Sequence, residues 1–173
     1  MHLFIKPADS GDAAVISLLG RITFAETFGY LFERQADDLR TYLDRTFGVT
    51  HIAASLGKAE NTYWLALRDG LPVGYAKLKA PSAPPGRDDA RASQLQKIYL
   101  MREFLGQGLG DGLLEAVVQS AMSRSDLIWL DVLQENQRAT RFYERHGFRI
   151  TGHDTYTIGA QSFLFHVMAR GLS

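Results

Sequence analysis

A run of alternating glycines between a predicted strand and a predicted helix constrains this chain more than any other feature. Residues 96–112 read QKIYLMREFLGQGLGDG, and every second residue from Gly106 to Gly112 is glycine. The stretch begins as an apolar strand, and the sequence after it, LLEAVVQSAM, is typical of a helix. The first N–H groups of a helix have no partner within it, and the helix dipole favours an anion there. Because glycine lets the backbone approach closely and adopt positive φ, this stretch predicts a phosphate-binding loop.

The glycine spacing argues against two common phosphate-binding motifs. A dinucleotide fingerprint, G-x-G-x-x-G, needs its third glycine where this chain has Asp111 or Leu113. A Walker loop needs Lys after its last glycine, where this chain again has Leu113. The pattern that remains is Gln107-x-x-Gly110-x-Gly112. A flexible turn that caps an ordinary helix is the structural alternative.

The composition predicts one domain over residues 1–173. The chain has 173 residues and 46% hydrophobic content, which is enough for a sizeable core. Nineteen basic and nineteen acidic residues cancel, so we expect no nucleic-acid partner. Cysteine is absent, which excludes a disulfide framework, a cysteine nucleophile and thiolate metal sites. The histidines show no metal-ligand spacing, so we expect no metal.

No targeting or membrane segment is expected. The N-terminus lacks an apolar run after a basic segment, and no apolar stretch comes near the ~20 residues that span a bilayer. We therefore expect a cytoplasmic protein without a membrane partner. The oligomeric state stays open, with a homodimer as one option.

The hydrophobic periodicity predicts an α/β fold. Strands are expected at residues 2–6, 61–68, 71–78, 98–100, 127–133, 148–156 and 161–168. Helices are expected from a cap at Asp9 or Ser10 to about residue 28, and at 36–47, 50–56, 113–122 and 136–146. The first helix has its apolar positions at Val15, Leu18, Leu19 and Ile22. A hairpin followed by strand–helix crossovers predicts a mixed sheet with helices on both faces.

A second pattern, downstream of the glycines, shares one helix face. Asn136, Ala139 and Tyr143 are spaced by three and four residues, so their side chains line the same face of the predicted helix. The small residue between two polar ones leaves room for a thin ligand chain. The alternatives are a plain helix cap at Asn136 and a core tyrosine at Tyr143.

Both patterns resemble coenzyme A motifs of the GNAT superfamily of N-acetyltransferases. The glycine pattern is similar to that superfamily's pyrophosphate loop, [QR]-x-x-G-x-[GA], and Asn136-x-x-Ala139-x-x-x-Tyr143-x-x-x-Gly147-Phe148 is similar to its second motif. The resemblance implies the GNAT acyl-CoA N-acyltransferase fold, a mostly antiparallel sheet that is splayed between its fourth and fifth strands and has helices on both faces. It also implies acetyl-CoA as the cofactor, with the pantetheine arm in the splayed gap.

A closer resemblance, to the bacterial PaiA-type polyamine N-acetyltransferases, covers most of the chain. It is carried by the segments ITFAETFGYLF, QKIYLMREFLGQGLG, IWLDVLQENQRATRFYERHGF and TGHDTYTIG. It is strong from Gln96 to Gly152 and weaker near the N-terminus. The tail departs from the pattern at Ser162-Phe163-Leu164, where an acidic residue is expected. This resemblance implies a small cationic acceptor amine, with polyamines as the first to test.

The resemblance also implies roles for particular residues. Tyr143 is expected to protonate or hydrogen-bond the departing thiolate as a general acid, and Asn136 to bind the pantetheine amide. Glu26 is the candidate that deprotonates the amine, with an exposed helix-surface carboxylate as the alternative. A backbone N–H near Tyr99–Leu100 is expected to stabilise the oxyanion. The expected cofactor-binding residues are Ile98, Tyr99, Leu100, Arg102, Gln107, Gly108, Leu109, Gly110, Asp111, Gly112, Asn136, Ala139, Tyr143 and Arg145.

The expected substrate-binding residues are Glu26, Phe28 and Tyr30. Glu26 and Glu33 flank an aromatic cluster of Phe28, Tyr30 and Phe32, and carboxylates beside aromatic faces suit an alkylammonium. The alternative is that these aromatic residues belong to the core.

Two other function classes stay open. One is an acetyl-CoA-binding regulatory protein of the same fold without significant turnover, and the other is a nucleotide-binding oxidoreductase. The missing dinucleotide spacing argues against the oxidoreductase. Tyr143 favours the enzyme over the regulatory protein, because a pure binder needs no phenol on that helix face.

Overall fold

The computed structural model describes residues 2–173, which form a seven-stranded sheet in the order β1-β2-β3-β4-β5-β7-β6. The strands are β1 (Leu3–Pro7), β2 (Asn61–Arg68), β3 (Leu71–Lys79), β4 (Ala92–Leu100), β5 (Leu127–Leu133), β6 (Arg149–Ile158) and β7 (Gln161–Gly171). The helices are α1 (Ala13–Phe28), α2 (Ala36–Phe47), α3 (Val49–Leu56), α4 (Leu109–Met122) and α5 (Gln137–Arg145), with short 3-10 turns η1 (Ser10–Asp12), η2 (Gly29–Phe32) and η3 (Arg102–Phe104). The predicted α/β class is confirmed.

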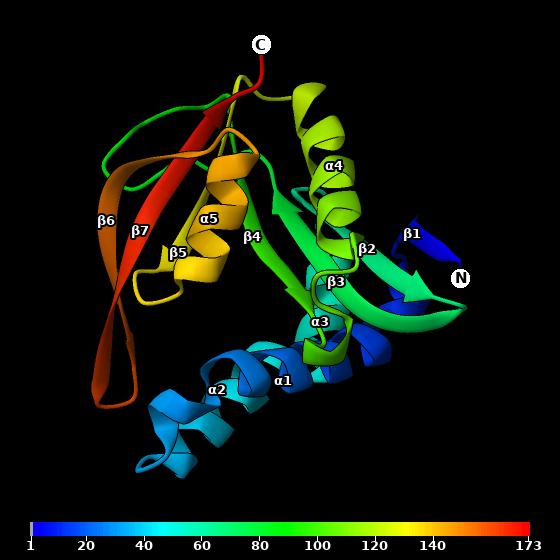
Figure 1. The fold of residues 1–173 in the computed structure, drawn as a ribbon, viewed down its shortest axis with the longest axis vertical. Helices are drawn as coiled ribbons and strands as arrows, with labels where there is room; N and C mark the ends of the chain where they lie inside the picture. Colours follow the sequence, from blue (N-terminus) through cyan, green and yellow to red (C-terminus); the bar gives the residue numbers. More distant parts are fainter. Residues whose placement is uncertain (1) are drawn as a thin grey trace.

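The sheet is antiparallel except between β4 and β5, which pair in parallel over three residues only. The pairs join Ala92–Gln94 to Leu127–Trp129. Beyond them the two strands separate towards the end of the molecule where α1 and α2 lie (Figure 1). The splay expected between the fourth and fifth strands is therefore present.

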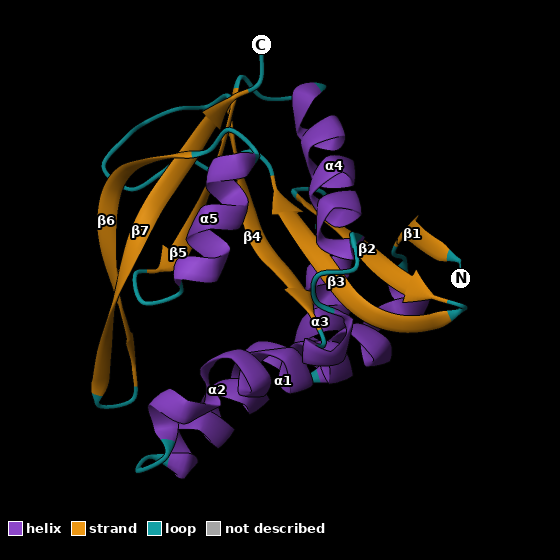
Figure 2. Cartoon of the chain, viewed as in Figure 1, coloured by secondary structure: helices purple, strands orange, loops and turns teal. Residues whose placement is uncertain are grey.

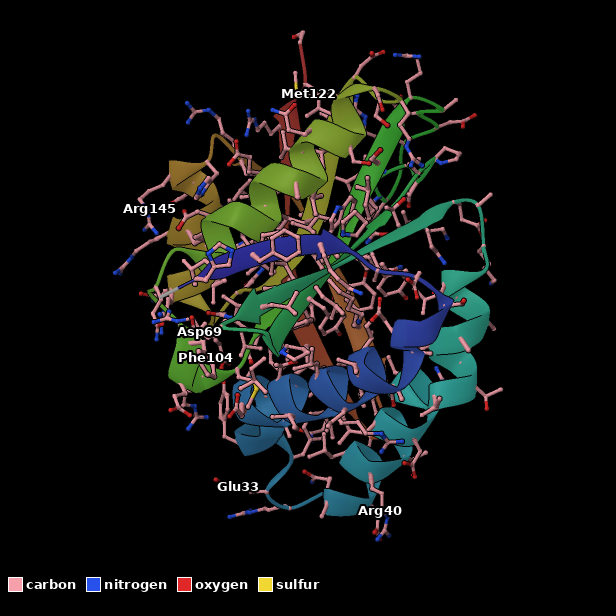
Figure 3. The ribbon with its side chains drawn as sticks, turned by 90° about the vertical axis from the view of Figure 1, so that its right-hand side faces the viewer. Glu33, Arg40, Asp69, Phe104, Met122 and Arg145 are labelled. Carbon is pink, nitrogen blue, oxygen red and sulfur yellow. The ribbon has the colours of Figure 1, made fainter. Side chains whose placement is uncertain are left out.

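Helices cover both faces of the sheet, as predicted (Figure 2). Helices α4 and α5 pack on one face over a core that includes Leu114, Leu130 and Phe148. Helices α1, α2 and α3 pack on the other face over a core that includes Phe24 and Phe47. Figure 3 shows the two layers: Met122 and Arg145 mark the α4–α5 side, and Glu33 and Arg40 mark the α1–α2 side.

The N-terminal helix begins and packs largely as the sequence predicts. Asp9 caps the 3-10 turn η1 that leads into α1, because its side chain accepts a hydrogen bond from Gly11 N at 2.8 Å and its own N–H donates to Asp12 Oδ2 at 2.9 Å. Leu18, one of the apolar positions at helical spacing, does not face the core: it is 60% exposed, and the buried face of the helix passes through Ile16 instead. The buried face also contains Gly20, which packs closely against α2. A Cβ at this position would stand 2.3 Å from the Phe47 ring, so a larger residue does not fit there.

The expectation that no apolar stretch reaches membrane-spanning length is wrong. The helical segment Ser10–Phe32 is long and apolar enough by length and composition, with a mean hydropathy of 1.2. Such a segment is weak evidence for a membrane span, because the core helix of a soluble protein passes the same test. Here α1 buries Ile16, Leu19 and Phe24 in the core beneath it.

The strand boundaries follow the prediction except where pairing extends a strand. The sequence predicts the central strand from residue 98, whereas β4 begins at Ala92 because it pairs with β3 and, at its start, with β5. Asp69 and Gly70 form the expected hairpin turn, with φ of 49° and 85°. Pro7 is included in β1, where an edge strand tolerates the missing N–H.

Candidate active site

A cavity of about 780 Å³, here called the splay cleft, opens where β4 and β5 separate. Its walls come from β4, β5, α5, the glycine loop (residues 106–112) and the end of α1. Five basic side chains line it against three acidic ones. This excess of positive charge suits an anionic ligand.

The glycine loop provides free backbone donors at the start of α4. Gly108 is the N-terminal cap residue and has a left-handed backbone with φ of 82°, which favours glycine. The first backbone hydrogen bond of the helix runs from Gly112 N to Gly108 O, so the N–H groups before Gly112 are free for a ligand. The loop therefore both begins α4 and presents free donors that suit an anion.

Most of the expected cofactor-binding residues line the splay cleft. These are Ile98, Tyr99, Leu100, Arg102, Gly108, Gly110, Asp111, Asn136, Ala139, Tyr143 and Arg145. Three do not. Leu109 is buried in the core, and Gly112 lies against Ile5 of β1. Gln107 turns away, with its amide donating to Glu103 O and its oxygen accepting from Arg68.

The splay leaves one edge of β4 unpaired. Met101 N donates to Val73 O of β3 at 2.9 Å. Because N–H groups alternate sides along a strand, the Tyr99 N–H also faces β3, whereas those of Ile98 and Leu100 face the gap. Free donors along the gap can stabilise negative charge on a carbonyl oxygen. This alternation narrows the expected donor near Tyr99–Leu100 to Ile98 or Leu100.

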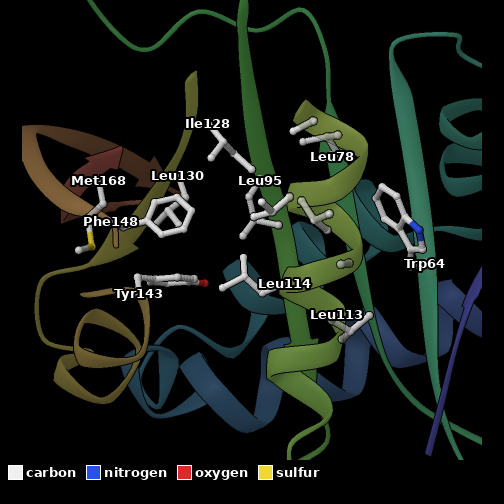
Figure 4. Close-up of a cluster of buried hydrophobic side chains, with 14 of the residues drawn as sticks. Trp64, Leu78, Leu95, Leu113, Leu114, Ile128, Leu130, Tyr143, Phe148 and Met168 are labelled. Carbon is white, nitrogen blue, oxygen red and sulfur yellow. The ribbon is translucent and has the colours of Figure 1, made fainter. Parts of the chain in front are cut away.

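Helix α5 and its cap line the splay cleft with both polar and apolar side chains, among them Asn136, Ala139 and Tyr143. The Asn136 Oδ1 caps the helix by accepting from Ala139 N at 3.1 Å, and no described residue accepts from its Nδ2. Tyr143 is 8% exposed, and its hydroxyl hydrogen-bonds to no residue in the range 2–173. Figure 4 shows this hydroxyl directed from α5 towards Leu114 of α4. Burial raises the pKa of Tyr143, so the phenol keeps its proton and acts as a hydrogen-bond donor.

Glu26 borders the splay cleft but is already engaged. Its Oε2 accepts from Arg102 N at 2.8 Å, and the Arg102 guanidinium donates to the Glu26 backbone oxygen at 2.5 Å. These two bonds tie the end of α1 to the turn before the glycine loop. The carboxylate thus has a structural role beside the cleft, whatever further role it has in proton transfer.

A second cavity of about 490 Å³ lies on the α1–α3 side of the sheet and is here called the aromatic cavity. Its aromatic lining consists of Phe24, Phe28, Phe32, Tyr42, Phe47, Tyr63, Tyr75, Tyr99, Tyr156, Phe163 and Phe165. It shares Phe28, Lys97, Tyr99, Asp131 and other residues with the splay cleft. The two cavities therefore meet at the splay, one on each side of the sheet.

The expected substrate residues are placed unevenly around this junction. Phe28 lines both cavities, whereas Tyr30 is 56% exposed and lines neither. Glu33 is also exposed, outside both cavities, on the far side of the molecule from Arg145 (Figure 3). Phe32 lines the aromatic cavity. The predicted pairing of carboxylates with the aromatic cluster therefore does not form around Tyr30 and Glu33.

Asp131 is the most important residue that sequence reasoning missed. Its Oδ2 accepts from the Tyr156 hydroxyl at 2.7 Å, and its buried Oδ1 has no partner among residues 2–173. Burial raises the pKa of this carboxyl, and the hydrogen bond from Tyr156 opposes the rise. The sequence does carry one indication of this residue, because Asp131 is the single acidic residue within the apolar run Leu127–Leu133. Arg138, on the exposed side of α5, is a further missed residue that lines the splay cleft.

The described residues hold no group of three or more His, Asp or Glu side chains placed to bind a metal ion. His153 and His166 lie close, with 3.3 Å between their Nδ1 atoms, but Gln134 is the third member of that cluster.

Comparison with known proteins gives a consistent result. Residues 23–148 match the model of the acetyltransferase (GNAT) family. Two proteins named as uncharacterized N-acetyltransferases, from Mycobacterium tuberculosis and Mycobacterium bovis, are each 34% identical over 137 residues, which is 79% of this chain and 83% of theirs. A similarly named protein of Lactobacillus delbrueckii subsp. lactis is 26% identical over 142 residues, 82% of this chain and 81% of its own.

Solved structures share the fold at low sequence identity. The PaiA N-acetyltransferase of Thermoplasma acidophilum, in complex with coenzyme A, gives a TM-score of 0.78 at 15% identity and covers 99% of both chains. A GCN5-related N-acetyltransferase from Rhodopseudomonas palustris gives a TM-score of 0.76 at 18% identity, covering 99% of this chain and 96% of its own. These matches confirm the predicted fold.

Proposed function

Because the chain belongs to the acetyltransferase (GNAT) family, it is an acetyl-CoA-dependent N-acetyltransferase, and we propose that it acetylates a primary amine of a small molecule held in the aromatic cavity. When bound, acetyl-CoA supplies the thioester whose acetyl group is transferred. The amine forms the new N–C bond, the C–S bond breaks, and the thiolate departs. The amine proton passes to a base of the protein.

The splay cleft fits the cofactor in shape and charge. Free N–H groups at the start of α4, with Arg138 and Arg145 nearby, suit the phosphates. The unpaired edge of β4 at Ile98 and Leu100 suits an amide-containing chain, and so does the Asn136 side chain that lines the same cleft. The proposal therefore assigns the predicted cofactor-binding residues that line the splay cleft to this ligand.

The observation that carries the acceptor proposal is the junction of the two cavities at the splay. An acetyl group at this junction is accessible from the aromatic cavity on the opposite face of the sheet. Direct attack by the amine needs such an arrangement, because both reactants must meet in one oriented encounter.

Tyr143 is proposed to stabilise the departing thiolate. Tyr143 lines the splay cleft, and its hydroxyl has no partner among the described residues, which leaves it free to donate. Burial raises its pKa, so it is suited to a strong hydrogen bond more than to complete proton transfer. The general-acid role that the sequence predicts would require the hydroxyl proton to pass completely to the thiolate, and we propose the hydrogen bond instead.

Two carboxylates compete for the role of base. Asp131 lies at the junction, and its Oδ1 has no partner among residues 2–173. Glu26, the predicted base, lines only the splay cleft, and its Oε2 accepts from Arg102 N. A raised pKa makes Asp131 the stronger base, and we propose it for this role ahead of Glu26.

The proposal is tested by amine-dependent thiol release from acetyl-CoA. The acceptor panel contains spermidine, putrescine, lysine-containing peptides, aminated antibiotics and amino acids, and mass spectrometry identifies the N-acetylated product. Release above the hydrolysis blank with at least one amine is expected. A protein that binds acetyl-CoA in calorimetry but turns over none of these amines would favour the regulatory alternative. The polyamine acceptor that the PaiA resemblance implies remains a prediction within this panel.

A further inference from the structure

Two lysines lie side by side in the aromatic cavity without acidic partners. Lys77 of β3 and Lys97 of β4 are directly opposite in the antiparallel pair, so their side chains leave the same face of the sheet. Both line the aromatic cavity. The Lys77 Nζ lies 5.6 Å from the centre of the Tyr63 ring, and the Lys97 Nζ lies 5.5 Å from the centre of the Phe47 ring. Neither ammonium forms an ion pair with any acidic residue in the range 2–173.

This pair of cations is costly for the folded protein. Burial lowers the pKa of Lys97 to about 8, and burial together with repulsion from Lys97 lowers the pKa of Lys77 to about 8. Like charges directly opposite in a sheet destabilise it, and a buried charge without a counter-ion does so further. An anionic group bound between the two ammonium groups would offset both costs.

The remaining charges of the cavity are arranged asymmetrically. Arg45 adds a further positive charge to the lining, and Asp131 is the only carboxylate there. Asp131 and Lys97 both lie at the junction with the splay cleft, whereas Lys77 lines the aromatic cavity alone. A polyamine could pair one ammonium with Asp131, but its other charges would lie among the lysines. An amine that also carries a negative group matches both the carboxylate and the lysines.

A buried hydroxyl and the aromatic walls complete the site. Tyr75 is 1% exposed and lines the aromatic cavity, and its hydroxyl has no hydrogen-bond partner among residues 2–173. A buried hydroxyl without a partner is rare, and a ligand oxygen in the cavity would satisfy it. Aromatic walls such as those of Phe24 and Phe47 favour an apolar body.

We propose that the acceptor is a primary amine that carries a carboxylate on an apolar body, as an apolar amino acid does. This inference rests on the proposed function. The amine lies at the junction beside Asp131, the carboxylate binds Lys77 and Lys97, and the aromatic walls hold the apolar body. The transfer itself is unchanged: the N–C bond forms, the C–S bond breaks, and the amine proton passes to Asp131.

The experiment compares matched acceptors that differ only in the carboxylate. The pairs are L-phenylalanine with 2-phenylethylamine, and L-leucine with 3-methylbutylamine, with spermidine as the polyamine arm. The variant Lys77→Met/Lys97→Met keeps the apolar stems and removes both charges. Lys79→Gln is the control, because Lys79 lies on the same strand and lines neither cavity.

We expect the wild type to show at least tenfold higher kcat/KM for the carboxylated member of a pair. This ratio should fall at least tenfold in Lys77→Met/Lys97→Met and stay unchanged in Lys79→Gln. A wild type that prefers spermidine or the amine without a carboxylate overturns the inference, and so does a double variant that keeps the preference.

A failure of the proposed function can be separated from a failure of this inference. If the wild type turns over no amine, calorimetry of the coenzyme A-loaded protein with the same carboxylated amines tests whether the carboxylate site exists. Binding that is lost in the double variant supports the carboxylate site even though the proposed turnover fails. Absent binding, or binding that the double variant retains, overturns the inference.

Discussion

The Tyr156 hydroxyl donates a hydrogen bond of 2.7 Å to Asp131 Oδ2 and so joins the closing β6–β7 hairpin to β5 at the junction of the two cavities. This contact holds one carboxylate oxygen and leaves Oδ1 without a partner among residues 2–173. A carboxylate fixed in this way, with a pKa raised by burial, is a suitable base for an amine that enters from the aromatic cavity.

Asp131→Asn should lower kcat/KM by roughly 10²–10⁴, the usual contribution of a positioned acid or base. Glu26→Gln should cost less than tenfold, and Asp88→Asn, at an exposed acid outside both cavities, should be neutral. Steady-state kinetics near neutral pH measures all three. A Glu26→Gln effect larger than that of Asp131→Asn would return the base role to Glu26.

The same carboxylate predicts the acid limb of the pH profile. Burial raises the pKa of Asp131 above its ordinary value of 3.8, so the active ionised form is lost, as pH falls, earlier than for an exposed aspartate. The acid limb of kcat/KM for the wild type should report this raised pKa. The acid limb should disappear from the profile of Asp131→Asn. An acid limb that is unchanged in this variant would show that another group causes it.

Lys97→Met should raise the thermal unfolding midpoint near neutral pH. Below about pH 8 the lysine is protonated in both the folded and the unfolded chain, so the penalty of the buried charge is fully present. Between pH 8 and the ordinary lysine pKa near 10.4, the unfolded chain binds more protons, and wild-type stability rises with pH. The gain from Lys97→Met should therefore shrink between pH 7 and pH 10. A gain that does not depend on pH would show that packing, not charge, causes it.

Gly20→Ala should destabilise the fold by about 1–3 kcal/mol, because the new methyl group must displace a buried ring. An ideal Cβ at this position stands 2.3 Å from Phe47, which is 1% exposed. Gly29→Ala is the matched control, since a Cβ there meets nothing within 4 Å. Urea unfolding midpoints compare the two variants. Equal midpoints for Gly20→Ala and the wild type would mean that the ring moves at little cost.

Gly110→Val should weaken coenzyme A binding at least tenfold, about 1.4 kcal/mol. Gly110 lines the splay cleft at the start of α4, and a Cβ there lies at ordinary contact distance from Phe142 and Leu100. The variant should therefore fold, which a thermal melt checks. Calorimetry measures the Kd for coenzyme A. Unchanged affinity in the folded variant would show that the loop is a turn without a role in binding coenzyme A.

The sequence places the residues of the splay cleft better than those of the aromatic cavity, because the determinants of the cleft are local. A helix cap, a glycine with positive φ and a spacing of three and four residues on one helix place Gly108, Asn136 and Tyr143 without knowledge of the rest of the fold. The aromatic cavity is assembled from the six strands β2 to β7 and the three helices α1 to α3, so its members are distant in sequence. Asp131 was hidden in an apolar strand, and Lys77 and Lys97 meet only through the β3–β4 register.

Leu18 and Tyr30 show the same limit within one segment. Helical spacing allows Leu18 on the inward face, but α2 and α3 cover a face centred on Ile16 and Gly20, which leaves Leu18 exposed. Tyr30 lies in a 3-10 turn after α1, where the direction of a side chain depends on how the turn packs. The hydrophobic periodicity predicts neither the exposure of Leu18 nor the side-chain direction of Tyr30, because both depend on tertiary contacts.

The most direct test of the account is the turnover of Tyr143→Phe. The phenylalanine ring fills the same space, so the fold and most of the acetyl-CoA affinity should persist, while the only change is the loss of the hydroxyl of a residue that lines the splay cleft. With an acceptor found in the amine panel, kcat should fall by roughly 10²–10⁴ while the Kd for acetyl-CoA stays within a factor of about two. A kcat within a factor of two of the wild type, with chemistry shown to be rate-limiting, would contradict the assignment of Tyr143 to the departing thiolate.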